Sequence, residues 1–559
     1  MTTITLFTKP DCPFCPKAKD FLSEAGLTFD EIDVTASTRN ADLAVATSGR
    51  TSVPQVFFGT VLIGGADELQ ALKAAGLLQE AAATADGSLI LDAIPDDELH
   101  RDAEDIPLSA AITERHPVED AVADPDQRAI LRHFRETFGF MPNSGHYQTH
   151  WPEAYKLYSY SHHFDTEQGE AKILGKPVML ATAWSTSNAH GCDYCRVHTT
   201  NMGGEAGGTQ KMIKAARDGT APEDHPIGPF ELKLVDLAAA ATTNTATQEL
   251  IYGIHATADE ARTPTATPDE AIRSTAMVAA AFGFLNVFND IIDVDIEREW
   301  ADAAEKSAGV GSGRHGVSRD RASDNLDDLD ADLPEGGRTA EEVMARYDAS
   351  VASRGGVESF AEAELGLSPN WVAAWPEDRR ARHVLFYTEV MGDRVHSLIP
   401  SELKHLMARV AAIATGHAAL AATEGFFAIR AGGGSDRAAA RARACWDEAI
   451  MCHGLRTPPH GLFDERERAA LTLAWLSAQA PLATPRRFLE PALRAFAPRE
   501  LIELSFVCGL ASMIQRFAAI AKPELDAEAE AVLRDVGIET NTIALRAPRP
   551  SPAPAQSAA

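Results

Sequence analysis

Cysteine is scarce in this chain, with seven residues among 559. So few cysteines exclude the dense disulfide framework that holds many small secreted proteins together. In a reducing compartment, cysteines that are close in sequence are more often catalytic or metal-binding than structural. Two such pairs are present, Cys12 with Cys15 and Cys192 with Cys195, and each is a candidate functional site.

Basic residues and long apolar runs are also lacking. Lysine and arginine number 51 against 81 acidic residues, for a net charge of -30. This charge disfavours nucleic acid and anionic membranes as partners, because both would be repelled. No unbroken apolar run reaches the ~18 residues of a membrane span, and the first residues lack the pattern of a secretory signal. We therefore expect a cytoplasmic protein with neither a membrane nor a nucleic acid as partner.

The hydrophobic content of 45% is sufficient for folded cores, and the length suggests about three or four domains. Local composition then divides the chain. The predicted segments are an α/β domain (1–80), an acidic linker (81–125), a helical domain (126–305), a flexible Gly/Ser/Asp-rich linker (306–338), a second helical domain (339–535) and a disordered tail rich in Pro and Ala (536–559).

The first 80 residues alternate short β-rich runs with helical ones. Strands are predicted over 4–8 and 29–34, a hairpin over 54–65, and helices from Cys12 to about Ala25 and over 66–76. With a further helix before the hairpin, the order β-α-β-α-β-β-α predicts a small sheet flanked by helices.

The motif "CPFC" lies where the first strand ends and a helix begins. A helix N-terminus stabilises a thiolate, and Lys9 adds a nearby positive charge. Cys12 is therefore the predicted nucleophile, and Cys15 the resolving partner. Further on, "TSVP" makes the Val53–Pro54 bond a candidate cis peptide beside the cysteines.

With "CPFC", "TSVP" and "GGADEL" in this order, residues 1–80 resemble a glutaredoxin. The resemblance implies a thioredoxin-like α/β fold, with glutathione or another low-molecular-weight thiol as reductant and no bound cofactor. Phe14 stands where the family usually has tyrosine. The positions that the resemblance assigns to glutathione binding are Lys9, Phe14, Ser52, Val53, Pro54, Gly65, Ala66 and Asp67.

The second pair lies in "HGCDYCRVH", residues 190–198. On a helix that begins near Gly191, residues three apart share a face, so Cys195 neighbours both Cys192 and His198. A neutral imidazole can accept the proton of a neighbouring thiol, and His190 could also relay protons. The alternatives are inert buried cysteines, or a zinc site with a fourth ligand from His162, His163 or His190. Since a zinc module normally has a second close ligand pair, we predict redox chemistry and no metal.

Residues 126–305 resemble the alkylhydroperoxidase D (AhpD) and carboxymuconolactone decarboxylase-like family. The resemblance depends on "FGFMPN", "WPEAYK", "NAHGCDYCRVH", "FELKLVDLAAAATTN" and "AFGFLNVFNDI". It implies an all-helical fold in which Cys195 attacks the peroxide, Cys192 resolves, and His198 relays protons with a glutamate. The family's glutamate, about twelve residues before the first cysteine, is missing here. His190, Glu170 or His255 is expected to replace it.

Three segments of the first helical region have counterparts, in the same order, in residues 339–535, which indicates an internal duplication with a period of roughly 210 residues. This second AhpD-like copy is degenerate, because His417 and Leu420 stand near the cysteine positions. We predict a structural role for it. The isolated Cys445, Cys452 and Cys508 are predicted to be buried small side chains.

Together the two pairs predict a thiol-dependent hydroperoxidase. The helical pair would reduce a hydroperoxide, and the fused glutaredoxin-like domain would reduce the resulting disulfide. The alternatives are a general dithiol–disulfide oxidoreductase and a redox sensor without turnover; lactone decarboxylation suits relatives without the cysteine pair. The family resemblance also implies a homo-oligomer.

Overall fold

The computed structural model describes residues 3–85, 87–94, 99, 108–112, 124–164, 169–202, 208–222, 224–262, 267–319, 336–451, 461–479 and 486–546. These residues form two compact units. The first unit takes its described residues from 1–106, 409–495 and 529–559, and the second takes them from 107–408 and 496–528. Each unit therefore combines segments that are far apart in the sequence.

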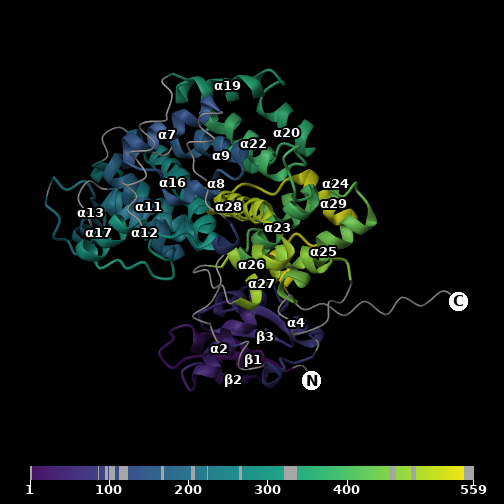
Figure 1. Ribbon diagram of the computed structural model, residues 1–559. Coiled ribbons are helices and arrows are strands. Elements are labelled where there is room, and N and C mark those ends of the chain that lie inside the picture. The colour runs from purple at the N-terminus through teal and green to yellow at the C-terminus, as the bar shows by residue number, and fades with distance from the viewer. Residues whose placement is uncertain are drawn as a thin grey trace. The chain divides into compact units, whose positions relative to one another are not determined.

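A four-stranded sheet in the order β2-β1-β3-β4 forms the centre of the N-terminal domain (Figure 1). Its strands are β1 (Ile4–Thr8), β2 (Asp30–Asp33), β3 (Gln55–Phe58) and β4 (Val61–Gly64). β1 runs parallel to β2, with Thr5 opposite Asp30, and antiparallel to β3, with Thr5 opposite Phe57. The β3–β4 pair is the hairpin predicted from the sequence.

Four helices accompany this sheet: α1 (Cys15–Glu24), α2 (Thr38–Ser48), α3 (Ala66–Ala74) and α4 (Leu78–Thr84). Ser37 caps α2 by accepting a hydrogen bond from Asn40 N, and Gly49 ends this helix at φ +68°. The arrangement confirms the predicted α/β domain and is consistent with a thioredoxin fold. Most of the remaining described chain is helical.

The first unit also contains helices from the C-terminal part of the chain, namely α24 (Ala418–Ala431), α25 (Asp436–Met451), α26 (Glu465–Ser477), α27 (Arg486–Ala495), α30 (Thr542–Arg546) and most of α29 (Ala527–Asp535). Arg50 Nε donates to Gln479 Oε1 over 2.6 Å. The prediction of a disordered tail over 536–559 is wrong for residues 536–546, because α30 packs on α3 and Arg546 is buried. Residues 547–559 lie outside the described part of the chain.

The second unit is helical. Its helices are α7 (Pro125–Phe138), α8 (Asn143–Gln148), α9 (Pro152–Tyr158), α10 (Ala171–Leu174), α11 (Lys176–His190), α12 (Asp193–Asn201), α13 (Gly208–Arg217), α14 (Pro229–Thr242), α15 (Gln248–Ala256), α16 (Pro268–Ile292), α17 (Arg298–Ala308), α19 (Ala340–Ala352), α20 (Val357–Leu365), α21 (Asn370–Ala374), α22 (Glu377–Met391) and α28 (Pro498–Ala521). A π-helical turn, Ser159–His163, continues α9, and α23 (Ser401–Thr415) extends from this unit into the first.

The long helices α16 and α28 pack along each other in the core of the second unit, where α28 is the yellow helix of Figure 1. Gly283 permits this close approach, because a Cβ there would lie 3.2 Å from the Ser512 carbonyl oxygen. By length and composition both helices could cross a membrane. However, 94% and 89% of their most apolar windows are buried inside the protein, and core helices pass the same test.

Two local arrangements in the second unit match each other closely. Asn143 donates its backbone N–H to Glu297 and its side-chain amide to Asp295 O. Asn370 does the same with Asp526 and Glu524 O. In addition, α16 and α28 both end at a non-glycine residue with positive φ, Asp293 and Lys522. These repeated details support the internal duplication.

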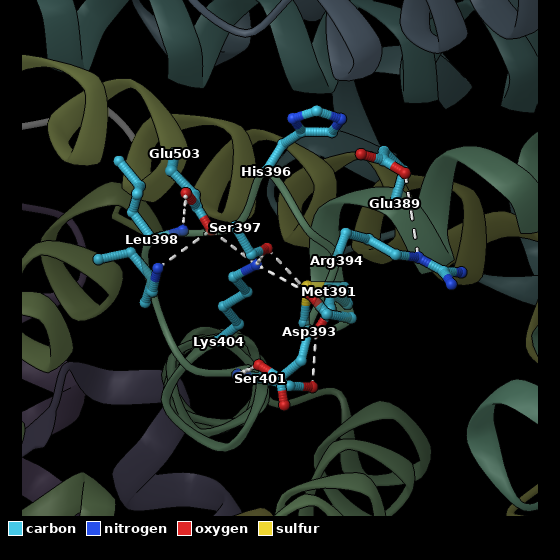
Figure 2. A network of polar contacts seen from close by, with 12 residues as sticks. Glu389, Met391, Asp393, Arg394, His396, Ser397, Leu398, Ser401, Lys404 and Glu503 are labelled. Carbon is cyan, nitrogen blue, oxygen red and sulfur yellow. Dashed lines mark hydrogen bonds and ion pairs between the residues drawn. The ribbon is translucent and has the colours of Figure 1, made fainter.

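The connection between α22 and α23 is tied to α28 by a buried polar network (Figure 2). Lys404 and Glu503 are fully buried and lie 2.7 Å apart. Glu503 also accepts hydrogen bonds from the backbone N–H groups of Leu398 and Ile399, while Lys404 donates to Ser397 Oγ and Gly392 O. α28 is thereby held in place near its start.

Candidate functional site

Cys12 and Cys15 form a disulfide at the start of α1, and their Cα atoms are 5.4 Å apart. Both are buried, with 3% and 2% of their surface exposed, so exposure does not distinguish the predicted nucleophile. Cys15 N lies 3.0 Å from Cys12 Sγ, as expected at a helix N-terminus. Val53 O lies 3.4 Å from the same sulfur. The "CPFC" and "TSVP" motifs therefore meet.

The predicted glutathione-binding positions surround this disulfide from three segments. The Val53–Pro54 peptide bond is cis, and a Cβ on Gly65 would lie 3.2 Å from Pro54 O. The loop before β3 therefore lies against the start of α3. Lys9, Phe14, Ser52 and Asp67 are exposed, Val53 and Gly65 are half-buried, and Pro54 and Ala66 are buried. The four exposed side chains are therefore accessible to a ligand.

The half-buried carboxylate of Glu68 supports Gly65 at the start of α3. Glu68 Oε2 accepts the Gly65 N–H over 2.7 Å, and Arg546 lies 3.4 Å from Glu68 Oε1. Burial raises the pKa of Glu68, but the charges of Arg546 and Arg50 with the backbone hydrogen bonds prevail and lower it to about 2. Glu68 is therefore ionised at neutral pH and orders the start of α3.

Cys192 and Cys195 lie at the start of α12, where a sharp turn separates this helix from α11. Gly191 has φ +87°, which suits glycine, and Cys192 caps α12. The Cys195 N–H lies 3.5 Å from Cys192 Sγ. Both thiols are free, with exposures of 0% and 2%. The helix N-terminus therefore favours negative charge at Cys192.

A pocket in the second unit leads to Cys195 and His198, but Cys192 does not line it. Its space is about 780 Å³, part of it open to solvent. The apolar and aromatic lining residues are Phe134, Phe138, Pro142, Tyr158, Met179, Leu180, Tyr194, Met202, Ala281, Phe282 and Leu285. Asn289 Nδ2 donates to Cys195 Sγ over 3.4 Å. Of the two sulfurs, Cys195 is therefore the one that a pocket ligand meets.

The carboxylate beside His198 is Glu297, which directly precedes α17. Its Oε2 lies 2.6 Å from His198 Nε2, and its Oε1 accepts from Tyr194 OH at 2.9 Å and from Asn143 N at 2.6 Å. Burial raises the pKa of Glu297, but His198 and the hydrogen bonds lower it below its usual value. Glu297 is therefore an ionised acceptor that orients the imidazole.

The expectation that Glu170 or His255 replaces the missing family glutamate is wrong. Glu170 accepts a hydrogen bond from Ser274 and pairs with Arg379. The exposed His255 lies 3.4 Å from Asp269. Neither contacts His198, whose carboxylate partner comes from a loop that follows the cysteines in sequence.

A second set of charged groups lies beside Cys192. Asp290 Oδ1 is 3.0 Å from His315 Nε2, and Asp290 Oδ2 is 3.2 Å from His190 Nε2. Arg516 Nη2 donates to His190 Nδ1 over 2.8 Å. All four groups are buried. Burial raises the pKa of Asp290, but the hydrogen bonds and charges of both histidines hold it well below its usual range.

His315 belongs to the segment that composition predicts to be a flexible linker, 306–338. In the described part, 306–308 complete α17, and Ile296 N bonds to Gly316 O at 2.8 Å while Ser318 N bonds to Ile296 O at 2.9 Å. The imidazole is 3% exposed. Within 306–319, Val310 and His315 are buried, so the segment is anchored at these two residues while much of it is exposed.

The donor atoms of Cys192, Asp290 and His315 lie within 4.8 Å of one another, close enough to raise the question of a metal. Both ring nitrogens of His315 already face oxygen atoms, Asp290 Oδ1 and Val294 O, each at 3.0 Å. Of the histidines proposed as a fourth zinc ligand, His162 lies 3.1 Å from His383, whereas His163 lines the same pocket as Cys195 and His198. Hydrogen bonds within the protein thus account for the contacts of His315 in the cluster with Cys192 and Asp290.

The second copy has no thiol at the corresponding place, because His417 precedes α24 and Leu420 lies in it. Cys445 and Cys508 are buried, as predicted, and Cys452 lies outside the described residues. The functional residues that sequence reasoning missed are Glu297, Asp290, His315 and Arg516. The sequence offers one faint signal, since an acidic residue follows the long apolar helix in both copies, Glu297 after α16 and Asp526 after α28.

Comparison with known proteins finds that residues 4–63 match the glutaredoxin family model. Glutaredoxin 3 of Escherichia coli K12 is 40% identical over 76 residues, which are 14% of this chain and 92% of that protein. The hybrid peroxiredoxin hyPrx5 of Haemophilus influenzae is 50% identical over 68 residues, 12% of this chain but only 28% of that protein. A solved structure of the debrominase Bmp8 C82A with 2,3,4-tribromopyrrole covers 32% of this chain and 89% of its own, with 19% identity and a TM-score of 0.28.

Proposed function

Because this chain belongs to the glutaredoxin family through its N-terminal domain, we propose that it is a thiol-dependent hydroperoxidase. Its helical cysteine pair reduces the peroxide, and its glutaredoxin domain returns that pair to the dithiol. The observation that carries this proposal is that Cys195, of the two helical sulfurs, lines a pocket together with His198, whose imidazole lies 2.6 Å from the Glu297 carboxylate. The name of the hybrid peroxiredoxin relative offers further support for peroxide chemistry beside a glutaredoxin segment.

In the first step, the Cys195 thiolate attacks the distal oxygen of a hydroperoxide. The O–O bond breaks, Cys195 becomes a sulfenic acid, and the alkoxide takes a proton from His198 to leave as an alcohol. Glu297 supports this proton transfer by holding the imidazole at 2.6 Å. The apolar and aromatic lining of the pocket favours an organic hydroperoxide.

In the second step, Cys192 attacks the sulfenic sulfur and water leaves. The resulting Cys192–Cys195 disulfide is opened by Cys12, and Cys15 resolves the mixed disulfide. Glutathione, or another small thiol, then reduces the Cys12–Cys15 disulfide. Because both pairs belong to one chain, the donor is present at an effective concentration on the order of millimolar.

The AhpD-like identity of the two helical copies is part of the same proposal, as are the homo-oligomer and the cytoplasmic location. The roles of Lys9, Phe14, Ser52, Val53, Pro54, Gly65, Ala66 and Asp67 in binding glutathione also belong to it. The exposure of four of these eight positions beside the disulfide is consistent with that role.

The test is peroxide-dependent oxidation of glutathione by the purified full-length protein. We expect Cys195→Ser to abolish turnover, because serine cannot form a sulfenic acid. Cys508→Ser, a matched change at a buried cysteine remote in sequence from both pairs, should retain it. If peroxide consumption survives in Cys195→Ser, the assignment is wrong. A single stoichiometric oxidation without cycling would instead identify a redox sensor.

A further inference from the structure

Cys192 has a proton-carrying group of its own, distinct from the His198–Glu297 pair beside Cys195. That group is His315, whose donor atom lies within 4.8 Å of those of Cys192 and Asp290. The bridge between Ile296 and Val317 holds this segment, and the imidazole is 3% exposed. His315 is therefore a fixed part of the site, although it comes from a stretch between α17 and α19.

The contacts of His315 define its protonation. Nδ1 lies 3.0 Å from the carbonyl oxygen of Val294, and Nε2 lies 3.0 Å from Asp290 Oδ1. A carbonyl oxygen and an ionised carboxylate only accept hydrogen bonds. Both ring nitrogens must then carry hydrogen, so His315 is an imidazolium whose charge Asp290 balances.

The surroundings of Asp290 favour this assignment. Arg516 donates to His190 Nδ1, and since a guanidinium has no acceptor, the His190 proton resides on Nε2, facing Asp290. Burial lowers the pKa of His190, which keeps this imidazole neutral. Asp290 is therefore left as the counter-ion of His315.

Cys192 needs such a group more than Cys195 does. It is fully buried, and burial is the largest of the causes that raise the pKa of its thiol, whereas the nearby His315 lowers it. When an incoming thiolate opens the disulfide at Cys195, Cys192 is the leaving group. A buried thiolate without a proton or cation nearby would leave slowly, because leaving-group ability falls as thiol pKa rises.

We propose that His315 is the acid and base of Cys192, a catalytic residue that acts at the resolving sulfur. It gives its Nε2 proton to Cys192 when the disulfide opens and recovers it when Cys192 attacks the sulfenic acid. This inference rests on the proposed dithiol–disulfide cycle of the site. It adds a second proton route to that cycle and directs the reductant to Cys195.

The step balances in both directions. On opening, the thiolate forms a new S–S bond with Cys195, the Cys192–Cys195 bond breaks, and its electron pair stays on Cys192, which takes the proton of His315. On closing, Cys192 returns that proton to His315 as its sulfur bonds to Cys195. The departing hydroxide takes a proton from His198, which has regained one from solvent after the first step, and becomes water. The reductant is a thiolate, supplied by the glutaredoxin domain or by a small thiol.

The direction of the pKa shift agrees with the geometry. Burial alone lowers the pKa of His315, but Asp290 and Cys192 outweigh it and raise the value to about 10. The titratable and charged groups that face this imidazole are Asp290, Asp293 and Cys192, with the Tyr194 ring centroid 6.1 Å away and Arg314 pairing with Asp293. The proton is thus held throughout the neutral range and lost only in alkali.

The experiment follows disulfide opening in the full-length protein. The Cys192–Cys195 disulfide is formed with peroxide and verified by mass spectrometry, and its opening by excess glutathione is followed by stopped flow, using thiol trapping. His315→Gln should open on the order of a hundredfold more slowly at pH 7, the usual contribution of a general acid. His255→Gln, at an exposed histidine of the same unit, should be unchanged. In a Cys192→Ser background, His315→Gln should leave the formation of Cys195 sulfenic acid unaffected.

A second variant, Asp290→Asn, tests the proton itself. Without the carboxylate, the pKa of His315 falls, because burial then dominates. The ratio of wild-type to variant opening rate, which cancels the ionisation of glutathione, should rise with pH between about 6 and 9. A ratio that stays flat across this range would indicate a merely structural role and overturn the inference. NMR titration of the oxidised wild-type protein should find one histidine still protonated at pH 9.

Failure of the inference is distinguishable from failure of the proposed function. If peroxide never produces the Cys192–Cys195 disulfide in wild-type protein, the proposed function fails. If that disulfide forms but opens equally fast in His315→Gln, only the role of His315 is wrong. A stoichiometric metal ion in purified protein that His315→Gln loses would also overturn this role, because a nitrogen that ligates metal does not hold the proton.

Discussion

Each helical cysteine has a histidine beside it, and each histidine has a buried carboxylate. His198 faces Glu297 at 2.6 Å, and His315 faces Asp290 at 3.0 Å. A buried imidazole keeps its orientation and its proton only when a partner accepts from it, since burial alone favours the neutral ring. Each of the two sulfurs, although only three residues apart, thus has a histidine–carboxylate pair of its own.

Glu297→Gln tests this at the residue scale. Glutamine keeps the size of the side chain but removes the charge that lowers the energy of a protonated His198. We expect sulfenic acid formation at Cys195 to slow on the order of a hundredfold at pH 7.

The measurement is the rate of peroxide reaction in a Cys192→Ser background across pH. Glu305→Gln is the matched control, because Glu305 is exposed on the same helix, α17. Equal rates for Glu297→Gln and the parent protein would exclude Glu297 from the relay.

Among the elements, α28 links the two helical copies. It belongs to the copy without the cysteine pair, yet it packs along α16, and its Arg516 reaches His190 beside that pair. Near the start of α28, the buried Glu503 pairs with Lys404 of α23 (Figure 2). This pair anchors α28 to α23. The second helical copy therefore contributes one positively charged side chain, Arg516, to the edge of the cysteine site.

Lys404→Met should destabilise the second unit, because it removes the nearer of the two cations that pair with the buried Glu503 carboxylate and leaves only Arg499, at 3.3 Å. Breaking such a pair typically costs about 3–5 kcal/mol, whereas replacing both partners is often neutral. Chemical denaturation should therefore find Lys404→Met much less stable, and Lys404→Met with Glu503→Leu closer to wild type. Lys306→Met, at an exposed lysine, should change little. A double variant as unstable as the single one would contradict the argument.

At the scale of the whole molecule, two cysteine pairs share one chain, and each unit is assembled from distant segments. The glutaredoxin domain shares its unit with C-terminal helices, through Arg50 with Gln479 and Arg546 with Glu68. The N-terminal domain is thus packed against the C-terminal helices of its unit. We therefore expect the folding of the two segments to be coupled.

Cys12→Ser tests the transfer of electrons between the pairs. With glutathione as the sole reductant, we expect peroxide turnover to be lost, while one stoichiometric oxidation of the helical pair remains. Cys15→Ser should retain part of the turnover, because glutathione can resolve the mixed disulfide at Cys12. A small dithiol, which opens the helical disulfide directly, should rescue Cys12→Ser. Undiminished glutathione-driven turnover in Cys12→Ser would contradict the proposed electron transfer from the first cysteine pair to the second.

The strands of the N-terminal domain, the cis bond at Val53–Pro54 and the positions of both cysteine pairs at helix starts could be predicted from the sequence. Each depends on neighbours within a few residues, such as an alternating run, an X-Pro bond or a glycine turn. The same reasoning failed for residues 536–546 and 306–319, whose composition suggests mobility. Arg546 and His315 are ordered by partners far away in the chain, Glu68 and Asp290.

By itself, the sequence determined where the two cysteine pairs lie, because two cysteines three apart are a local feature that depends on no distant residue. Only the tertiary structure decided which acids and bases serve them. Glu297, His315 and Arg516 come from a loop, an apparent linker and a second copy of the fold. Their proximity to the sulfurs depends on packing between helices and loops. Contacts between residues that are about a hundred or more positions apart produce no periodic pattern in a single sequence.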